Sequence, residues 1–441
     1  MGGLLILIPK TFQPEIQYTL EVLLDEFLGL KIAYSQNTDS SDIEIHSPGM
    51  NTIIIQNHFF SNFNEPSGYL NISNLPEVQY WTDAGLSLNA LPVLYGYGKL
   101  EFIDSSFICH ADVIASAFFM LSRWEEVVDQ DKDQHARSTG AGSTAYKYHF
   151  LQRPIVNEYA DLIWAILLRA GYQGDRKKHK YTNVVTHDVD QQFKWPDGFT
   201  SIKHLTGDLI KRKDLALFKN NFRSYLDTKF NQKRDPFDTH DELLKLADHH
   251  GIKSYFNFTI SRETRDDVAL KISDPRLKNL IDRIESAGHT IGFHPGYNTH
   301  LDTTKFNNEL SKLQSLTQQQ ITCGRQHFLR FKVSDTWRLW HQAGMAWESS
   351  MSYSDMPGFR CGTCYPYTVF DVEKRIKLSV KEKPLIVMDA TLIYYVKSWD
   401  WQDLFTLKNE CKKHGGEFVS IWHNDLVNHP DLKEYEKLIY L

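Results

Sequence analysis

Two aspartates close the apolar segment NVVTHDVD, and their type and spacing could do chemistry. Asp188 and Asp190 are two positions apart, so on a strand both side chains would project from the same face. Two neighbouring carboxylates repel each other unless a cation or a proton lies between them. The pair therefore suits one metal ligand plus one general base, and an exposed pair that binds nothing is the alternative.

Two other interpretations of this Asp-x-Asp pair have less support. A phosphatase-type pair needs Thr or Val two positions after the second aspartate, where this chain has Gln192. A glycosyltransferase pair would bind a nucleotide sugar through a divalent ion. No glycine-rich phosphate loop accompanies it here.

Three later segments carry basic side chains near expected strand ends. His294 follows the apolar run TIGF, and Pro295 disfavours a helical conformation for the residue before it. Arg325 and His327 are two positions apart in CGRQHFLRF, so on a strand they would face the same way. His423 follows the last apolar run and could protonate a leaving group. Each of these residues could instead be structural.

The segment HPGYNTH raises the question of a third metal ligand. Two histidines four positions apart could chelate one ion, but Asn298 stands four positions after His294, and the next histidine is His300. An amide oxygen is a weak zinc ligand. His300 would be rotated by about 240° from His294 on a helix. We therefore rank His327 first as the third ligand, Asn298 second and His300 third.

The elements that would position these residues alternate between strands and helices from residue 178 onward, which predicts a parallel sheet, open or closed into a barrel. Thr239 and Glu242 resemble a capping box at the start of one helix, with Gly251 as its stop. Another helix is expected between Asp274 and Gly288. Barrel enzymes carry their sites at the carboxyl ends of the strands, where most of the candidate residues are expected.

A smaller α/β domain is expected at residues 1–175, before the barrel at 178–441. It opens with the strand-like runs LLILI and NTIIIQ. Two helices close it, one in HADVIASAFFMLSRWEEVV and one that begins at Pro154 as an N1 proline. A basic insertion from Trp195 to about Asp238 follows the first barrel strand. It could attract an anionic substrate or be a solvated helical excursion.

Composition excludes several classes of partner. The chain has 441 residues and a net charge of −6, which argues against a nucleic-acid binder. The sequence contains no run of about 18 apolar residues, so we expect no integral membrane segment. The start lacks the basic region and long apolar run of a signal peptide, so we expect a cytoplasmic protein. The Cys361–Cys364 pair is expected to be reduced; a redox pair or half of a zinc site is the alternative.

The order of these motifs resembles the NodB-like polysaccharide deacetylase superfamily. The first motif of that family commonly reads TFDDG, which implies Asp188 as the base and Asp190 as a metal ligand. The second motif, His-Ser-x-x-His, matches His294, with Asn298 in place of its second histidine. The family arginine that pairs with the base falls on Arg325.

The terminal histidine of the family falls on His423. The segment AGMAWESSMSYSDMPGFRCGT looks like the AG-Y-DSS segment, with Trp347-Glu348 replacing Tyr-Asp. The resemblance covers about Lys178 to Leu441 and implies a distorted (β/α) barrel of the polysaccharide deacetylase type. FFMLSRWEE and RPIVNEYA look closest to a two-domain bacterial branch, whose extra N-terminal domain has no assigned role.

The resemblance implies a metal-dependent carbohydrate N-deacetylase, a hydrolase that uses a divalent metal such as Zn²⁺. Its substrate would be an N-acetylated sugar or a glycan precursor. Two alternatives stay open: a catalytically inactive, carbohydrate-binding member of the same fold, for which Asn298 is the best argument, and an Asp-x-Asp glycosyltransferase.

Overall fold

The structure of the chain, a computed structural model, describes residues 3–38, 40–264, 267, 270–396 and 398–441. It contains two units, each assembled from three segments of the sequence. The first consists of Met1–Thr182, Leu329–Val387 and Trp399–Phe418, and the second of Asn183–Phe328, Met388–Ser398 and Val419–Leu441. The domain limits expected from the sequence, 1–175 and 178–441, stay a prediction. Within the described ranges, no helix is both long and apolar enough to cross a membrane.

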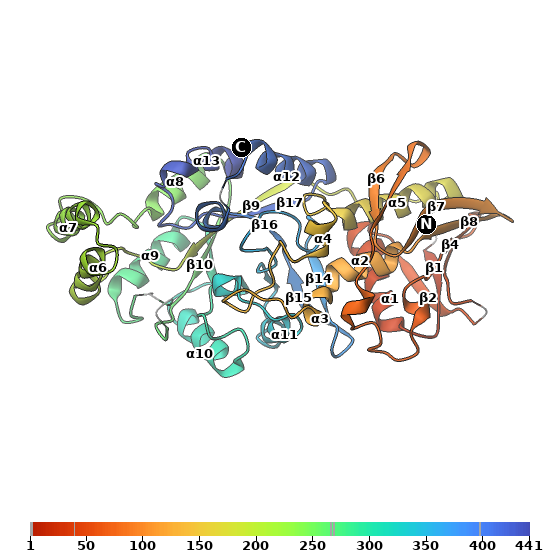
Figure 1. The fold of residues 1–441 in the computed structure, drawn as a ribbon, viewed down its shortest axis with the longest axis horizontal. Coiled ribbons are helices and arrows are strands. Elements are labelled where there is room, and N and C mark those ends of the chain that lie inside the picture. Colours follow the sequence, from red (N-terminus) through yellow and green to blue (C-terminus); the bar gives the residue numbers. More distant parts are fainter. Residues whose placement is uncertain (1–2, 39, 265–266, 268–269, 397) are drawn as a thin grey trace. The chain divides into compact units, whose positions relative to one another are not determined.

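A six-stranded sheet lies in the N-terminal part of the first unit (Figure 1). Its order is β2-β1-β3-β4-β8-β7, and β1 is parallel to β2 and antiparallel to β3. Leu4, Ile6 and Ile8 of β1 are buried, as expected where alternate side chains point into a core. The strands are β1 Leu4–Ile8, β2 Ile32–Gln36, β3 Ile43–His46, β4 Thr52–Ile55, β7 Gly96–Ile103 and β8 Ser106–Ala111; β5 Gln79–Asp83 and β6 Leu88–Val93 form a separate ribbon.

The helices of the first unit differ in detail from the expectation. The first expected helix is interrupted at Arg123, which has a φ of 54°, so that α2 ends at Ser122 and the short α3 follows. Pro154 precedes its helix instead of opening it. The helices are α1 Gln13–Leu20, α2 Val113–Ser122, α3 Glu125–Val128, α4 Thr144–Lys147, α5 Ile155–Ala170, α11 Asp335–Gln342 and α12 Trp401–His414. Three more strands pair in the order β14-β15-β13: β13 Trp347–Glu348, β14 Tyr367–Asp371 and β15 Ile376–Glu382.

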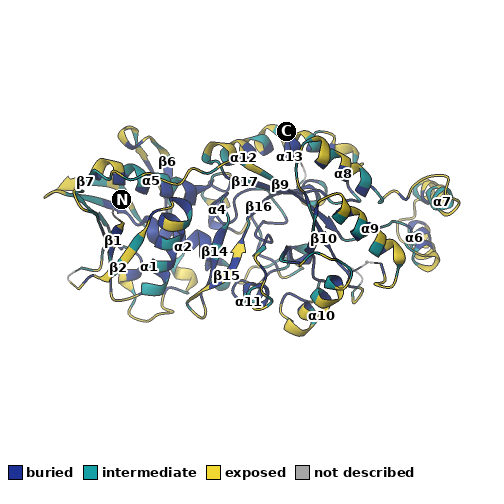
Figure 2. Cartoon of the chain, turned by 180° about the vertical axis from the view of Figure 1, so that it is seen from behind, coloured by how far each residue is buried: buried dark blue, intermediate teal, exposed yellow. Residues whose placement is uncertain are grey.

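The second unit contains a curled sheet with helices around it (Figures 1 and 2). Its strands follow the order β12-β11-β10-β9-β17-β16, and this part of the sheet curls into a half-barrel (Figure 1). The chain passes between the two units within β16 and β17. The strands are β9 Thr182–Val189, β10 Tyr255–Phe258, β11 Thr290–Phe293, β12 Cys323–Gly324, β16 Leu385–Met388 and β17 Glu417–Ile421. The helices are α6 Gly198–Ile210, α7 Leu215–Lys229, α8 His240–His249, α9 Pro275–Ser286, α10 Thr303–Gln314 and α13 Tyr435–Tyr440.

The register of three parallel strands brings their carboxyl ends to one level. Phe258 of β10 lies opposite Val189 of β9 and Phe293 of β11. The residues that follow these strands therefore meet at one edge of the sheet. This agrees with the expected parallel sheet and with the expected position of the candidate residues.

Two local expectations are wrong. Thr239 precedes α8, but its hydroxyl donates to the carbonyl of Asn424 (2.6 Å) and makes no capping hydrogen bond to the helix. The expected strand in CGRQHFLRF is only the two residues of β12, so Arg325 and His327 do not share a strand face. His327 instead begins a turn in which Phe328 has a φ of 60°.

Candidate metal centre and active site

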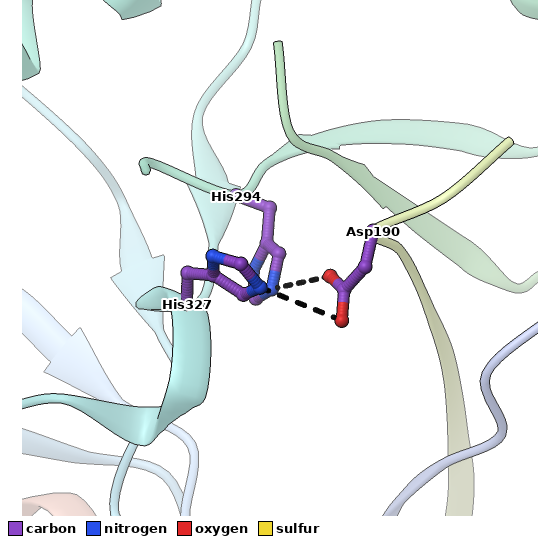
Figure 3. A group of neighbouring side chains, drawn as sticks. All are labelled: Asp190, His294 and His327. Atoms are coloured by element: carbon purple, nitrogen blue, oxygen red, sulfur yellow. Dashed lines mark ion pairs between the residues drawn. The ribbon is translucent and has the colours of Figure 1, made fainter. Parts of the chain in front are cut away.

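Asp190, His294 and His327 form a group that could hold a metal ion. Their ligand atoms all lie within 4.8 Å of one another. The Nε2 atom of His294 lies 3.0 Å from Oδ1 of Asp190, and Nε2 of His327 lies 3.6 Å from Oδ2 (Figure 3). Two imidazoles and one carboxylate make a ligand set typical of zinc.

Both imidazoles are oriented through Nδ1. Nδ1 of His294 lies 2.7 Å from the carbonyl oxygen of Arg325, and Nδ1 of His327 lies 3.2 Å from Oδ1 of Asp267. When each Nδ1–H donates these bonds, the lone pair of Nε2 points toward Asp190. Metal-binding histidines are commonly held by carbonyl or carboxylate partners in this way.

The charge balance of this group also fits a cation. Oδ1 of Asp190 is buried and accepts no hydrogen bond, although Nε2 of His294 is only 3.0 Å away. Burial alone would lower the pKa of His327, but the carboxylates of Asp190 and Asp267 raise this pKa to about 9. A positive charge is therefore favoured between these side chains.

Asp188 lies in a different environment from Asp190. Its Oδ1 accepts hydrogen bonds from Nη1 of Arg325 (2.8 Å) and Nδ2 of Asn257 (2.7 Å). Nη1 of Arg325 also donates to the hydroxyl of Thr186 (2.9 Å). Burial would raise the pKa of Asp188, but the Arg325 guanidinium holds it below its usual value. Asp188 is thus an ionised carboxylate whose other oxygen, Oδ2, lies 4.0 Å from Nε2 of His294.

A close approach between strands positions Asn257. A Cβ atom on Gly292 of β11 would clash with Oδ1 of Asn257 on the neighbouring β10. Glycine at 292 therefore leaves the space that the Asn257 amide occupies beside Asp188.

His423 follows β17 and is held by Asp389. Its Nδ1 lies 2.6 Å from Oδ1 of Asp389, and its backbone N–H donates to Oδ2 of the same carboxylate (2.7 Å). Burial would lower the pKa of His423, but Asp389 is the main cause that raises it to about 10. Nε2 of His423 lies 3.8 Å from Oδ2 of Asp190. The protonated form of this imidazole is therefore favoured beside the candidate metal group.

The six residues selected from the sequence therefore lie in one unit and near one another. His327, ranked first as the third ligand, belongs to the candidate metal group, and His300 does not. Asn298 lies in the turn after His294, and its place as second choice stays a prediction. The roles assigned to the six residues also stay predictions.

Three supporting residues were not selected from the sequence. Asp389 directly follows the apolar run LIVM of β16, and this strand-end position was a usable signal. Asn257 lies inside β10, where an amide has no distinctive pattern. Asp267 lies outside any helix or strand, so periodicity could not indicate it.

Comparisons with known proteins add distant likenesses. Residues 4–172 match the model of a family of unknown function (DUF7033). No curated protein matches the chain. One similar solved structure is described as a candidate polysaccharide deacetylase from Mycobacterium smegmatis; it is 15% identical, with a TM-score of 0.38, over 60% of this chain and 84% of that chain.

Two further solved structures are more distant. A candidate polysaccharide deacetylase involved in O-antigen biosynthesis, from Bordetella bronchiseptica, is 12% identical, with a TM-score of 0.29, over 58% of this chain and 76% of that chain. A mutant of a CE4-family pseudoenzyme with restored enzymatic activity is 12% identical, with a TM-score of 0.25, over 56% of this chain and 66% of that chain. At these scores the likenesses carry no functional argument, which must come from the site itself.

Proposed function

We propose that the protein hydrolyses the N-acetyl group of a sugar, on a glycan or a glycan precursor, with the help of a divalent metal ion. The observation that carries this proposal is the contrast between Asp188 and Asp190. Asp188 contacts Arg325 and Asn257, whereas Asp190 faces two imidazoles. One carboxylate is thus available as a base while the other is available as a ligand.

Asp190, His294 and His327 would hold the metal ion. When bound, a divalent ion such as Zn²⁺ supplies Lewis acidity, which polarises a carbonyl group and makes water more acidic. Asp267 and the carbonyl of Arg325 keep the two imidazoles in the orientation that this ligand set needs.

Asp188 is the general base in this proposal. It accepts the proton of the water that attacks the amide carbon. Its Oδ1 is engaged by Arg325 and Asn257, so Oδ2 is the oxygen that takes the proton. Arg325 keeps the carboxylate charged and oriented before the reaction.

His423 is the general acid. Its Nδ1 is engaged by Asp389, so Nε2–H is the proton that it gives to the departing amine. Cleavage then yields acetate and a free amino sugar. An acyl-transfer reaction of this kind needs one group that accepts a proton and another that supplies one, and Asp188 and His423 would fill these two roles.

The sugar substrate is supported by the motif order at Asp188–Asp190, His294, Arg325 and His423, which resembles the polysaccharide deacetylases. The inactive, carbohydrate-binding alternative is favoured by Asn298 at the second histidine of that motif. His327 lies in the candidate metal group and so supports an intact ligand set.

One experiment separates the two functions. Purified protein is analysed for bound metal, and acetate release is measured on N-acetylated oligosaccharides and sugar nucleotides, before and after chelation. Acetate release that chelator abolishes and added Zn²⁺ restores supports the hydrolase. A stoichiometric metal with sugar binding but no acetate release from either class of substrate would favour the inactive alternative.

A further inference from the structure

The helices α6 and α7 of the basic insertion expose large apolar side chains to solvent. Phe199 is 83% exposed and Ile210 is 73% exposed. Ile202, Leu209, Leu215, Phe222 and Phe230 are also exposed. Exposed apolar side chains that gather on one surface mark interaction sites in soluble proteins.

The helix α6 has its apolar side facing outward. At about 100° per residue, its exposed apolar side chains fall within an arc of about 100°. Those side chains are Phe199, Ile202, Leu209 and Ile210. The opposite side, which is buried, carries Ser201, Leu205 and Asp208. A surface helix normally has the reverse arrangement, with its apolar side toward the core.

Polar contacts hold the two helices together. Nδ2 of Asn221 on α7 donates to Oδ2 of Asp208 on α6 (2.8 Å), and both side chains are buried. Nζ of Lys194 donates to Oδ1 of Asn221 (2.9 Å), and Nε1 of Trp195 donates to the hydroxyl of Ser224 (3.1 Å). Hydrogen bonds between buried polar side chains thus hold α6 and α7 together. The exposed apolar side chains remain available to an outside partner.

The pair is also strongly basic. Residues 198–234 contain nine Lys and Arg against three Asp, in a chain whose net charge is −6. The three aspartates are engaged: Asp208 with Arg212 (2.6 Å), Asp227 with Lys233 (3.0 Å), and Asp214 with the backbone N–H of Leu217 (2.8 Å).

Three of the other cations are available to a partner. Lys211, Lys213 and Lys219 have no acidic partner among the residues that the structure describes, and all three are exposed. Lys211 and Lys213 lie directly beyond the end of α6, next to the exposed Ile210. A helix with exposed apolar side chains, followed directly by exposed lysines, suits a surface that is apolar below and anionic above.

We propose that α6 and α7 bind the surface of an anionic lipid bilayer. The apolar side chains of α6 enter the boundary between headgroups and acyl chains, and the lysines contact the lipid phosphates. Figures 1 and 2 show α6 and α7 side by side beyond α9 and β10, with exposed outer faces. A second copy of the pair is a poorer partner, because two basic surfaces repel each other. This inference is independent of the proposed hydrolase activity.

The test is sedimentation of the full-length protein with vesicles of phosphatidylcholine alone or mixed with phosphatidylglycerol. We expect binding to the mixed vesicles, and weaker binding at about 0.5 M salt, where charges are screened. The triple variant Phe199→Ser/Ile202→Ser/Ile210→Ser is expected to bind the mixed vesicles at least about tenfold more weakly than wild type. Lys211→Glu/Lys213→Glu should weaken binding to the mixed vesicles by a similar factor.

A control variant changes exposed apolar side chains elsewhere; Ile72 and Phe102 are about as exposed as Ile202. Ile72→Ser/Phe102→Ser removes two such residues of the first unit and should leave vesicle binding unchanged. Unchanged circular dichroism and Tm show that each variant folds. The proposal is overturned if wild-type protein does not bind the mixed vesicles or if the triple variant binds as well as wild type. It is also wrong if the triple change only abolishes a dimer. Because no acetate is measured, failure here is distinct from failure of the hydrolase proposal.

Discussion

At the scale of single residues, the candidate site contains two aspartates whose neighbouring side chains differ. Asp188 and Asp190 are separated by one residue, yet Asp188 faces a guanidinium and an amide while Asp190 faces two imidazoles. The two carboxylates therefore differ in local charge and hydrogen bonding.

Replacing each of the two aspartates in a separate variant should distinguish an effect on catalysis from an effect on metal binding. Asp188→Asn keeps the shape but cannot accept a proton, so acetate release should fall by about 10²–10⁴-fold with bound metal unchanged. Asp190→Ala removes a ligand and should lower the metal content itself. Both quantities are measured on the same preparations, by acetate assay and elemental analysis. Near wild-type turnover in Asp188→Asn would show that another group is the base.

The choice of third ligand gives a matched pair of variants. His327→Ala should weaken metal binding by about tenfold or more, because it removes an imidazole of the candidate group. His300→Ala, outside that group, should leave the affinity near that of wild type. Competition with a chromophoric chelator measures both. A larger loss in His300→Ala would reverse the ranking.

Metal binding should depend on pH through His327. Its pKa in the metal-free protein is raised from 6.5 to about 9, because the carboxylates of Asp190 and Asp267 outweigh burial. Protonated His327 therefore stabilises the metal-free fold below pH 6.5, and this stabilisation is lost as pH rises through about 9.

A metal must displace that proton, so its affinity should rise by up to about tenfold per pH unit until pH reaches about 9. Chelator competition at several pH values measures the slope, and His327→Ala should flatten it. A wild-type affinity that does not change with pH would contradict this assignment.

At the scale of elements, the register of β9, β10 and β11 is what gathers the site. Their carboxyl ends lie level, so Asp188, Asn257 and His294 come close although they are distant in sequence. Gly292 permits this spacing because a larger residue would collide with Asn257.

Gly292→Ala should therefore impair the base more than the metal group. The added methyl group displaces the Asn257 amide, Asp188 loses one hydrogen bond, and turnover should fall about tenfold or more. Bound metal should change little. Gly198→Ala is the control, since a Cβ at that position meets no neighbouring atom. Equal turnover in the two variants would mean that Asn257 does not position Asp188.

At the scale of the whole molecule, the first unit joins residues from both ends of the sequence. Nε of Arg360 donates to Oε1 of Glu126 (2.9 Å), and Nη2 pairs with Oε2. Burial would raise the pKa of Glu126, but Arg360 and Arg123 lower it to about 2. The ion pairs of ionised Glu126 thus stabilise the folded protein above pH 4.5, and this stabilisation is lost as pH falls toward about 2.

Glu126→Ala should destabilise the protein by about 3–5 kcal/mol, because it leaves the Arg360 charge buried without its partner. Thermal unfolding measures the loss. Glu410→Ala, which breaks the solvent-exposed pair with Lys413, should change the Tm little. By the same reasoning, a fragment of residues 178–441 should not be stable alone. A fragment that unfolds cooperatively would instead favour the domain limits expected from the sequence.

The sequence by itself determined several strand ends of the second unit and the residue types that follow them. An apolar run that ends in Asp188 and Asp190 predicts a strand end with two carboxylates, and β9 ends at Val189. His294 and His423 likewise follow strands. These features depend on residue type and short-range periodicity, which a sequence carries directly.

Only the tertiary structure decided which groups meet. Arg325 and His327 reach the site from a turn and not from one strand, and Asp267 comes from a segment with no pattern that points to it. The sequence also could not predict that the apolar side of α6 faces outward. Periodicity shows that a helix has two sides but not which one is buried. Contacts between residues distant in the chain depend on packing and strand register, which no short stretch of sequence specifies.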